Sequence, residues 1–225
     1  MSVVDLTHTL HPGIPTFDDA QCCAFRDLST VAKGGYFNRE LHLQEHVGTH
    51  IDAPAHFCAK GWHVDEIPAE KLMAPLVVLD VAKAVKQSAT YVVSVIDIKQ
   101  HEARHGKIPH GALVCAMTGW SERWDDPIRY RNDFRFPGFS LEAAELLVEE
   151  RRVVGLGIDT LSIDVGTSKA FEVHNFALAK KVYFLENLAN LDKVTPRGFT
   201  AVVGAIKTQG GSGGPARVLA IKAAL

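Results

Sequence analysis

The residues best suited to chemistry lie in one short stretch from Glu45 to Phe57, which reads E-H-V-G-T-H-I-D-A-P-A-H-F. Imidazole nitrogens and carboxylate oxygens are good ligands for Zn, Mn or Fe. Three such ligands with an open coordination position are typical of a catalytic metal site, where a bound water loses its proton near neutral pH. A further imidazole could then move protons. Any one of these side chains could be an ordinary core or loop residue, but their density favours a site at His46, His50, Asp52 and His56.

The residues around this stretch predict how it is displayed. Apolar or small residues occupy alternate positions from Leu41 onward, and period two is typical of a strand with one buried face. A straight strand rises about 3.3 Å per residue and would place His46 and Asp52 roughly 20 Å apart. Metal bonds are only about 2.0–2.2 Å long, so a shared ion requires the chain to curl.

Gly48 permits such a curl because glycine tolerates backbone angles closed to other residues. Pro54 prevents a regular helix after Asp52. We therefore expect a strand that ends in a curled loop at Gly48–Thr49. If His46, His50 and Asp52 share one ion, their donor atoms should lie within about 4 Å of one another.

The segment H-V-G-T-H-I-D-A-P-A-H resembles the signature H-x-G-T-H-x-D-x-P-x-H of the metal-dependent cyclase-like hydrolases. That family includes bacterial kynurenine formamidases and isatin hydrolases. The resemblance implies that His46, His50 and Asp52 are metal ligands and that His56 is the proton donor and acceptor. It also implies that a later His and Glu, spaced by twelve, complete a site for one or two divalent ions, Zn or Mn; here these are His174 and Glu186.

The same resemblance carries expectations for the fold and the assembly. It implies an α/β fold in which a mixed sheet curls toward a barrel with helices outside, and a homo-oligomer, either a dimer or a tetramer. Formamidases place a tryptophan in the substrate pocket near position 17, where this chain has Phe17; the alternative is an aromatic residue packed on the surface. Asp159, Ser162 and Asp164 resemble the family's I-D-T-x-S-x-D stretch, and we expect them to support the site from behind.

The rest of the chain alternates between expected strands and helices. Ser140 is a good N-cap for an amphipathic helix to about Arg152. Strand, helix and strand in succession indicate an α/β arrangement, and 225 residues suit a single domain, residues 1–225. Strands are expected at 3–10, Leu76–Val81, Ala112–Met117, Val153–Ile158, Phe199–Lys207 and Val218–Ala223, and a further strand is expected to end at Glu186. Short helices are expected within Trp62–Leu72, at Ile96–Arg104 and around His174.

Composition excludes several other classes of function. The chain is 47% hydrophobic and 22% charged with a net charge of −2, so nothing indicates a nucleic acid or membrane partner. The apolar runs are shorter than the ~20 residues of a membrane span, and the N-terminus does not resemble a signal peptide. Four cysteines without framework spacing are typical of reduced thiols, which predicts a cytoplasmic protein.

Three other features have no clear place in the metal site. His101, His105 and His110 lack carboxylate companions at useful spacing, so we expect them to be exposed. Residues 120–139 are rich in aromatic residues and arginine, which favours an interface between subunits, a lid over the substrate or an irregular packed loop. The glycine-rich stretch at 210–215 is expected to be a flexible turn, because no phosphate-loop lysine follows it.

Three functions fit these observations. The first is metal-assisted hydrolysis of an amide C–N bond in a small, aromatic, open-chain substrate, as in an arylformamidase acting on N-formylkynurenine. The second is ring opening of a cyclic amide such as isatin, or of a lactone. The third is a non-catalytic protein that binds a metal or ligand on the same scaffold. In the first two, His56 takes a proton from water and returns one to the leaving group.

Overall fold

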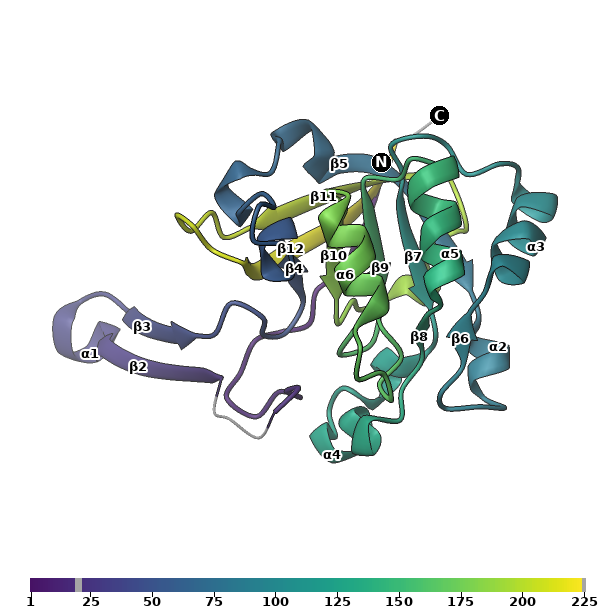
Figure 1. The fold of residues 1–225 in the computed structure, drawn as a ribbon. Helices are drawn as coiled ribbons and strands as arrows, with labels where there is room; N and C mark the ends of the chain where they lie inside the picture. Colours follow the sequence, from purple (N-terminus) through teal and green to yellow (C-terminus); the bar gives the residue numbers. More distant parts are fainter. Residues whose placement is uncertain (19–21, 224–225) are drawn as a thin grey trace.

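The computed structural model describes residues 1–18 and 22–223 (Figure 1). In this part of the chain, the main sheet has eight strands in the order β1-β12-β11-β5-β7-β9-β10-β4. A further pairing of β12 with β4 closes seven of them into a ring, and β1 pairs with β12 beside it. The mixed sheet curled into a barrel, with helices outside, is therefore confirmed. The strands are β1 Ser2–Asp5, β4 His50–Asp52, β5 Met73–Asp80, β7 Leu113–Met117, β9 Gly155–Ile158, β10 Tyr183–Glu186, β11 Phe199–Ala205 and β12 Gly213–Lys222.

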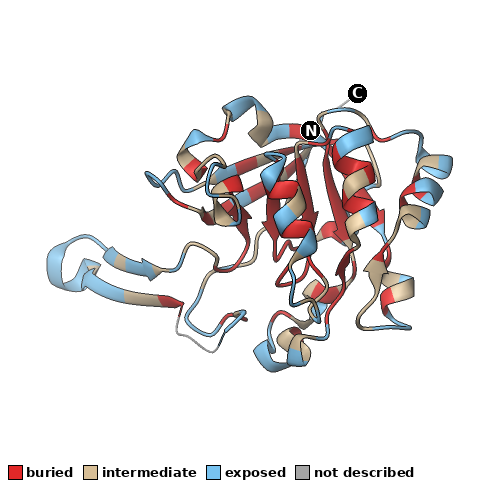
Figure 2. Ribbon diagram, in the orientation of Figure 1, coloured by how far each residue is buried: buried red, intermediate tan, exposed pale blue. Residues whose placement is uncertain are grey.

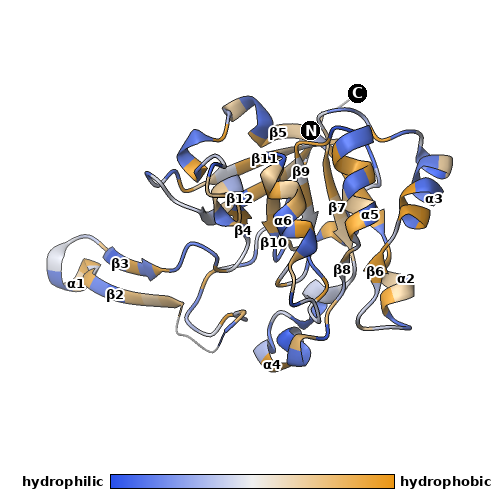
Figure 3. Cartoon of the chain, in the orientation of Figure 1, coloured by the Kyte–Doolittle hydropathy of each residue, from blue (hydrophilic) through white to orange (hydrophobic). Residues whose placement is uncertain are grey.

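The centre of the sheet is parallel and buried on both faces. Strands β5, β7, β9 and β10 run parallel, while the pairings through β4, β11 and β12 are antiparallel. Successive residues of β5 enter different cores: Leu76 and Val78 fill the inside of the barrel, whereas Val77 and Leu79 pack under the helices. This double burial explains why the strands read as continuous apolar runs, which Figure 3 shows as hydrophobic ribbons.

The longer helices lie outside this sheet (Figure 1). The Ser140 side chain accepts a hydrogen bond from the Ala143 amide, which caps the expected helix, and a π-helical turn continues that helix over Leu146–Glu150. The α-helices are α1 Val31–Gly34, α2 Ala82–Val85, α3 Val95–His105, α4 Pro127–Arg131, α5 Leu141–Glu145 and α6 Glu172–Ala179. Within the described residues, no helix has the length and apolar character needed to cross a bilayer.

The expected strand before the histidine stretch is interrupted. Among the described residues, β3 (Asn38–Leu43) pairs only with β2 (Cys23–Ser29), and regular structure resumes at β4. His46 therefore lies in the connecting loop, where the period-two pattern had predicted a strand. The strand expected at 3–10 is also shorter: β1 ends at Asp5, and beyond it Thr7 forms an isolated bridge with Leu188 before the turn at residues 12–13.

One of the expectations about exposure is wrong. His101 is buried, because α3 turns that side chain toward the sheet and its neighbours, while His105 and His110 are exposed as expected. The aromatic residues of 120–139 are mostly buried within their own chain, so the packed-loop alternative describes them and a subunit interface is not needed to cover them. They are Trp120, Trp124, Tyr130, Phe136 and Phe139. The remaining strands outside the barrel are β6 (Val92–Val93) and β8 (Gly138–Phe139), which pair with each other.

Candidate metal-dependent active site

The register between β4 and β10 creates the centre of the site. His50 lies opposite Glu186, while Ile51 and Leu185, one position along, face the interior of the barrel. Because side chains alternate along a strand, His50, Asp52 and Glu186 share the outer face. The Nε2 atom of His50 lies 3.2 Å from Oδ1 of Asp52 and 3.5 Å from Oε2 of Glu186.

The predicted curl at Gly48 is present and adds His46 to this face. Gly48 has φ +62°, a left-handed conformation that favours glycine, and a Cβ there would lie 2.4 Å from Cδ2 of Leu10, so that side chain would have to move. The loop turns His46 back until its Nδ1 is 2.6 Å from Oδ1 of Asp52. Its Nε2 lies 2.9 Å from the Ser212 hydroxyl.

His56 follows immediately on a single 3-10 turn, Pro54–His56, with Pro54 at the start, where a missing amide is tolerated. Its ring stacks on His46 with 3.8 Å between the ring centroids. His56 is more exposed than His50 and Asp52, so it lies toward the open side of the site. This position leaves it free to reach a bound molecule.

His174 enters the site from α6 and is held there by Asp164. The Asp164 carboxylate accepts hydrogen bonds from the Val173 and His174 amides and lies 2.6 Å from Nδ1 of His174. The Nε2 of His174 is consequently directed at Oδ2 of Asp52 and Oε1 of Glu186, at 3.4 and 3.5 Å. Asp164 thus supports the site from behind. Asp159, which the sequence analysis grouped with Asp164, instead accepts hydrogen bonds from Thr118 and Trp120, away from the metal-ligand cluster.

All six residues named from the sequence for chemistry border one cavity: His46, His50, Asp52, His56, His174 and Glu186. Two overlapping groups, one of His46, Asp52 and His56 and one of His50, Asp52 and Glu186, each have ligand atoms within 4.8 Å of one another. Asp52 belongs to both groups. The individual roles of metal ligand and proton carrier stay predictions.

The charges of the cluster fit a divalent cation. Burial by itself would lower the pKa of His50, but the adjacent Asp52 and Glu186 carboxylates raise it to about 9. Burial would raise the pKa of Asp52, yet hydrogen bonds from His174, His46 and His50 hold it well below its usual range. Burial and the Asp52 charge raise the pKa of Glu186, so two buried carboxyl groups this close together need positive charge beside them. The nitrogen and oxygen donors suit Zn or Mn.

A second set of residues, which the sequence reasoning missed, orients His50. Nδ1 of His50 donates to the Gly48 carbonyl at 2.8 Å, and the Asn187 amide donates to the same oxygen at 2.9 Å. The buried Tyr130 hydroxyl lies within hydrogen-bond distance of Oδ1 of Asn187 and the Asp159 carbonyl, at 3.0 and 2.9 Å. Asn187 follows Glu186 directly, but nothing in the sequence indicates that Tyr130, 57 positions away, meets it.

The glycine-rich stretch at 210–215 is part of the site, in contrast to the flexible turn expected. Gly213 and Gly214 begin β12 and pair with Asp52 and Ile51. A Cβ on Gly213 would lie 2.4 Å from the Ile51 carbonyl and 2.7 Å from the His46 ring, so only glycine allows this approach. Ser212 also donates from its amide and hydroxyl to the Glu45 carboxylate.

Three phenylalanines form an aromatic wall above the cluster, in a cavity of about 270 Å³. Phe17, the expected substrate-binding residue, lines the cavity and is 43% exposed. Phe57 and Phe171, which the sequence reasoning did not select, have ring centroids 4.7 and 5.7 Å from that of His174. Phe171 has φ +48°, an uncommon value for a bulky residue, and it turns the chain into α6.

Several known proteins are similar to this chain in both sequence and fold. The chain is 31% identical to an isatin hydrolase of Roseibium aggregatum over 98% of its own length and 92% of that protein. It is 24% identical to a kynurenine formamidase of Paracidovorax citrulli over 96% of its length and 94% of that protein. Isatin hydrolase A from Ralstonia solanacearum superposes with a TM-score of 0.93 at 35% identity, covering 99% of this chain and 92% of that structure.

These relatives are hydrolases, and the donor cluster described above is present in this chain with each of its members buried or half-buried. The chain is accordingly an enzyme, a metal-dependent amide hydrolase, and the non-catalytic alternative is set aside. The family model described as putative cyclase matches residues 4–165, which is more than half of the sequence. The chain belongs to the cyclase family of metal-dependent hydrolases.

Proposed function

We propose that this enzyme opens the ring of a neutral cyclic amide fused to an aromatic ring, an isatin-like substrate. Hydrolysis of an open-chain formamide such as N-formylkynurenine is the second candidate. The aromatic wall of Phe17, Phe57 and Phe171 favours a flat aromatic substrate in either case. The greater identity to isatin hydrolases than to the kynurenine formamidase supports the cyclic substrate.

The observation that carries the choice is the charge of the cavity wall. N-formylkynurenine has an amino-acid tail with a carboxylate, and a carboxylate taken out of water needs a cationic or hydrogen-bonding partner. Among the described residues that line the cavity there is neither lysine nor arginine, so the tail carboxylate would have only uncharged hydroxyl and amide groups, such as those of Thr16, Gln44 and Ser162, in place of a cationic side chain. Isatin has no charge, so the same wall suits it.

A divalent metal held by His46, His50, Asp52, His174 and Glu186 would act as a Lewis acid on the amide carbonyl and would lower the pKa of water. The chain supplies the remaining functions. Asp164 and the Gly48 carbonyl fix the ring orientations of His174 and His50. The aromatic wall positions the substrate and excludes bulk water from its ring.

His56 is proposed to carry the proton. Burial lowers the pKa of His56 to about 4, although the Asp52 charge opposes this, so the ring is neutral near pH 7 and able to accept a proton. The proton that water loses on attacking the carbonyl carbon passes to His56. As the C–N bond breaks, His56 returns a proton to the nitrogen, which gives an aromatic amine and a carboxylate.

The test of the substrate is a direct comparison of isatin and N-formylkynurenine with the metal-loaded enzyme. We expect kcat/KM to be about 10-fold or more higher for isatin, because one unpaired buried carboxylate costs more than about 1.4 kcal/mol. A higher kcat/KM for N-formylkynurenine would reverse the assignment. Hydrolysis of neither compound would reject both substrates.

The test of the proton carrier is His56→Ala. We expect bound metal to be retained and kcat to fall about 10²–10⁴-fold, the usual contribution of general acid–base catalysis. His105→Ala, a change at an exposed histidine on α3, serves as the control and should leave kcat unchanged. Full activity in His56→Ala would refute the role.

Three further properties stay proposals. Zn or Mn, as one or two ions, suits the donor set, and elemental analysis of the purified enzyme distinguishes these cases. A cytoplasmic location is supported by four free cysteines, of which Cys22, Cys23 and Cys115 are buried, and cell fractionation tests it. A homo-oligomer is supported by exposed large apolar side chains on the β2–β3 hairpin, among them Leu28, Phe37 and Leu41, and light scattering tests it.

A further inference from the structure

One imidazole of the metal-ligand cluster is held in the opposite sense to the other two. Nδ1 of His50 and Nδ1 of His174 each lie within 2.8 Å of an oxygen atom behind the cluster, so both rings turn Nε2 toward its centre. His46 instead places Nδ1 in the cluster, 2.6 Å from Oδ1 of Asp52, and directs Nε2 away from it, toward Ser212. The groups that hold this reversed ring therefore decide which of its nitrogens can bind a cation.

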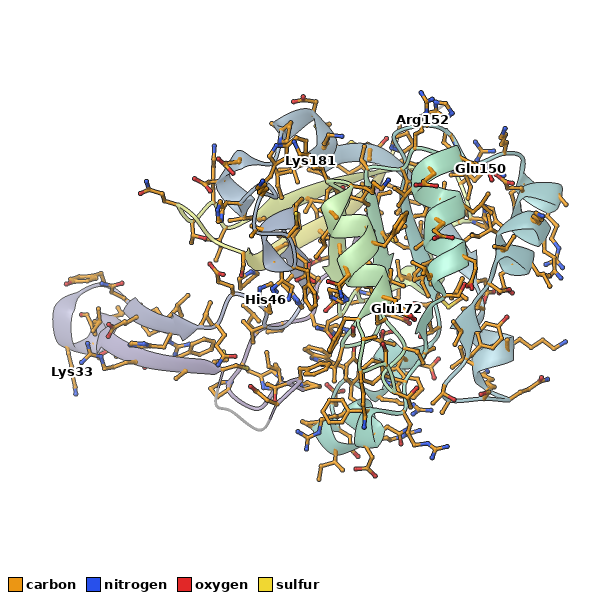
Figure 4. All side chains as sticks on the ribbon, viewed as in Figure 1. Lys33, His46, Glu150, Arg152, Glu172 and Lys181 are labelled. Atoms are coloured by element: carbon orange, nitrogen blue, oxygen red, sulfur yellow. The ribbon has the colours of Figure 1, made fainter. Side chains whose placement is uncertain are left out.

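Burial alone does not fix the ring of His46. Its side chain is 27% exposed, whereas those of His50 and His174 are 4% and 5% exposed. Figure 4 shows His46 where the β2–β3 hairpin joins the barrel, and Figure 2 shows the chain passing there from exposed to buried residues. A ring that the protein encloses only in part keeps freedom to turn, so its orientation has to come from hydrogen bonds.

The hydroxyl of Ser212 lies between His46 and Glu45. Its Oγ is 2.6 Å from Oε2 of Glu45 and 2.9 Å from Nε2 of His46. A glutamate carboxylate is ionised near neutral pH and only accepts hydrogen bonds, so the single hydroxyl proton of Ser212 is donated to Glu45. Oγ then has only lone pairs left for the imidazole. Nε2 of His46 consequently carries a proton and donates it to Ser212.

This assignment leaves Nδ1 of a neutral His46 with a lone pair that faces a carboxylate oxygen. Oδ1 of Asp52, at 2.6 Å, also has only lone pairs to offer. Two acceptors this close repel each other unless positive charge lies between them, either a proton or a metal ion. The same hydrogen bonds that place a proton on Nε2 thus prepare Nδ1 to hold a cation.

The loop before β12 is shaped to admit this chain of hydrogen bonds. The Ser212 amide also donates to Oε2 of Glu45, at 2.9 Å, so one residue holds the carboxylate twice. A Cβ on Gly211 would lie 2.6 Å from Oε1 of Glu45, and one on Gly213 would lie 2.7 Å from the His46 ring. The glycines on either side of Ser212 therefore leave room for both the acid and the imidazole that it joins.

We infer that Glu45 and Ser212 are positioning residues of the metal site, an inference that rests on the proposed function, in which His46 is a ligand. They hold His46 as the tautomer with a proton on Nε2 and offer Nδ1 to the cation. Together they act on this ring as Asp164 acts on His174. A carboxylate behind a ligand imidazole also raises its basicity, and loss of such a partner usually costs about 10- to 100-fold in metal affinity.

The experiment measures Zn²⁺ affinity by competition with a chromophoric chelator. Ser212→Ala removes the acceptor of His46 Nε2, and we expect affinity to fall about 10- to 100-fold. Ser212→Thr keeps a hydroxyl and should restore most of that loss. Glu45→Gln keeps an acceptor oxygen but removes the charge, so its loss should be smaller than that of Ser212→Ala. Ser88→Ala, at an exposed serine just after α2, is the control and should bind as the native chain does.

Combining Ser212→Ala with His46→Ala separates positioning from a general structural role. If Ser212 acts through His46, Ser212→Ala adds no further loss once His46 is absent, because residues in one network are not additive. An equal loss with and without His46 overturns the inference. Native affinity in His46→Ala overturns both the ligand role and the inference. Weakened binding in His46→Ala together with native binding in Ser212→Ala keeps the ligand role and overturns only the positioning.

Nuclear magnetic resonance of the native Zn²⁺-loaded enzyme tests the tautomer without any substitution. Long-range ¹H–¹⁵N spectra distinguish the ring nitrogen that carries hydrogen from the one that binds metal. We expect hydrogen on Nε2 of His46 but on Nδ1 of His50 and His174, and hydrogen on Nδ1 of His46 overturns the inference. None of these readouts depends on turnover. An enzyme that hydrolyses neither isatin nor N-formylkynurenine therefore rejects the proposed substrate and leaves this inference standing.

Discussion

Two buried histidines of this molecule have opposite properties. His50 and His101 are 3% and 8% exposed, and each lies beside another histidine ring, with centroid distances of 5.3 Å to His46 and 4.9 Å to His105. The pKa of His50 is raised to about 9, whereas the pKa of His101 is lowered to about 4. Burial acts in the same direction on both, so their neighbours make the difference.

Two carboxylates act on His50, whereas His101 lies near Arg197 and His105, with Glu102 opposing their effect on its pKa. His50 faces Asp52 and Glu186 with one nitrogen and donates to the Gly48 carbonyl with the other. His101 is close to Arg197 and His105, and its Nε2 has no hydrogen-bond partner in the described part of the chain. Clustered histidines alone therefore give a neutral core, and a cation site requires carboxylates together with an acceptor that fixes each ring.

The two histidines should differ most in bound metal and in kcat/KM when each is replaced by alanine. His50→Ala removes a proposed ligand, and we expect bound metal to be lost and kcat/KM to fall about 10³-fold or more, since a metal supplies several kcal/mol of transition-state stabilisation. His101→Ala should retain metal and activity. Elemental analysis and steady-state kinetics on both variants check this. Equal losses of metal would show that the two histidines do not differ in function.

A smaller effect is expected from the anchor behind His50. Tyr130→Phe removes only the hydroxyl that meets Asn187, and Asn187 holds the Gly48 carbonyl to which His50 donates. We expect metal affinity to fall about 10-fold, at the low end for residues that orient ligands. Tyr91→Phe removes a hydroxyl that donates to Asp97, far from the site along the chain, and is the matched control. Metal competition titrations measure both; unchanged affinity in Tyr130→Phe would remove the anchor from the site.

The smallest effect concerns His101 and pH. Its folded pKa of about 4 lies below the usual value near 6.5, so the unfolded chain binds this proton more readily between these values. The stability contributed by neutral His101 is fully present above about pH 6.5 and is lost as pH falls toward 4. Urea unfolding at pH 7 and pH 5 should show a larger loss in the native protein than in His101→Gln. An identical loss in both would mean that His101 is protonated in the folded chain.

Sequence patterns located the strands and helices of the barrel well. The apolar runs at Leu76–Val81 and Ala112–Met117 are strands because a strand buried on both faces has no polar side. Prediction was weaker where a neighbour far along the chain decides the conformation. Strand β3 ends at Leu43, opposite Cys23, where its antiparallel partner β2 begins, and the alternation that continues to Ile51 contains no sign of this.

For the active site too, some residues could be predicted from the sequence and others could not. The types and spacing of His46, His50, Asp52 and His56 were sufficient to predict a metal-dependent enzyme, because few stretches place that many donors so close together. Gly48 was sufficient to predict the curl. The sequence did not indicate Tyr130, Asn187, Phe57 or Phe171, since aromatic and amide side chains occur throughout any chain and only their positions give them a role.

The sequence by itself thus determined the reacting groups, the bend that gathers them and the fold class, because each depends on local residue types and short-range spacing. Only the tertiary structure decided that His50 faces Glu186 across β4 and β10, and that the glycines of β12 lie against His46. These relations depend on the register and closure of the barrel, which join residues more than a hundred positions apart. Local preferences along the chain do not specify such long-range pairings.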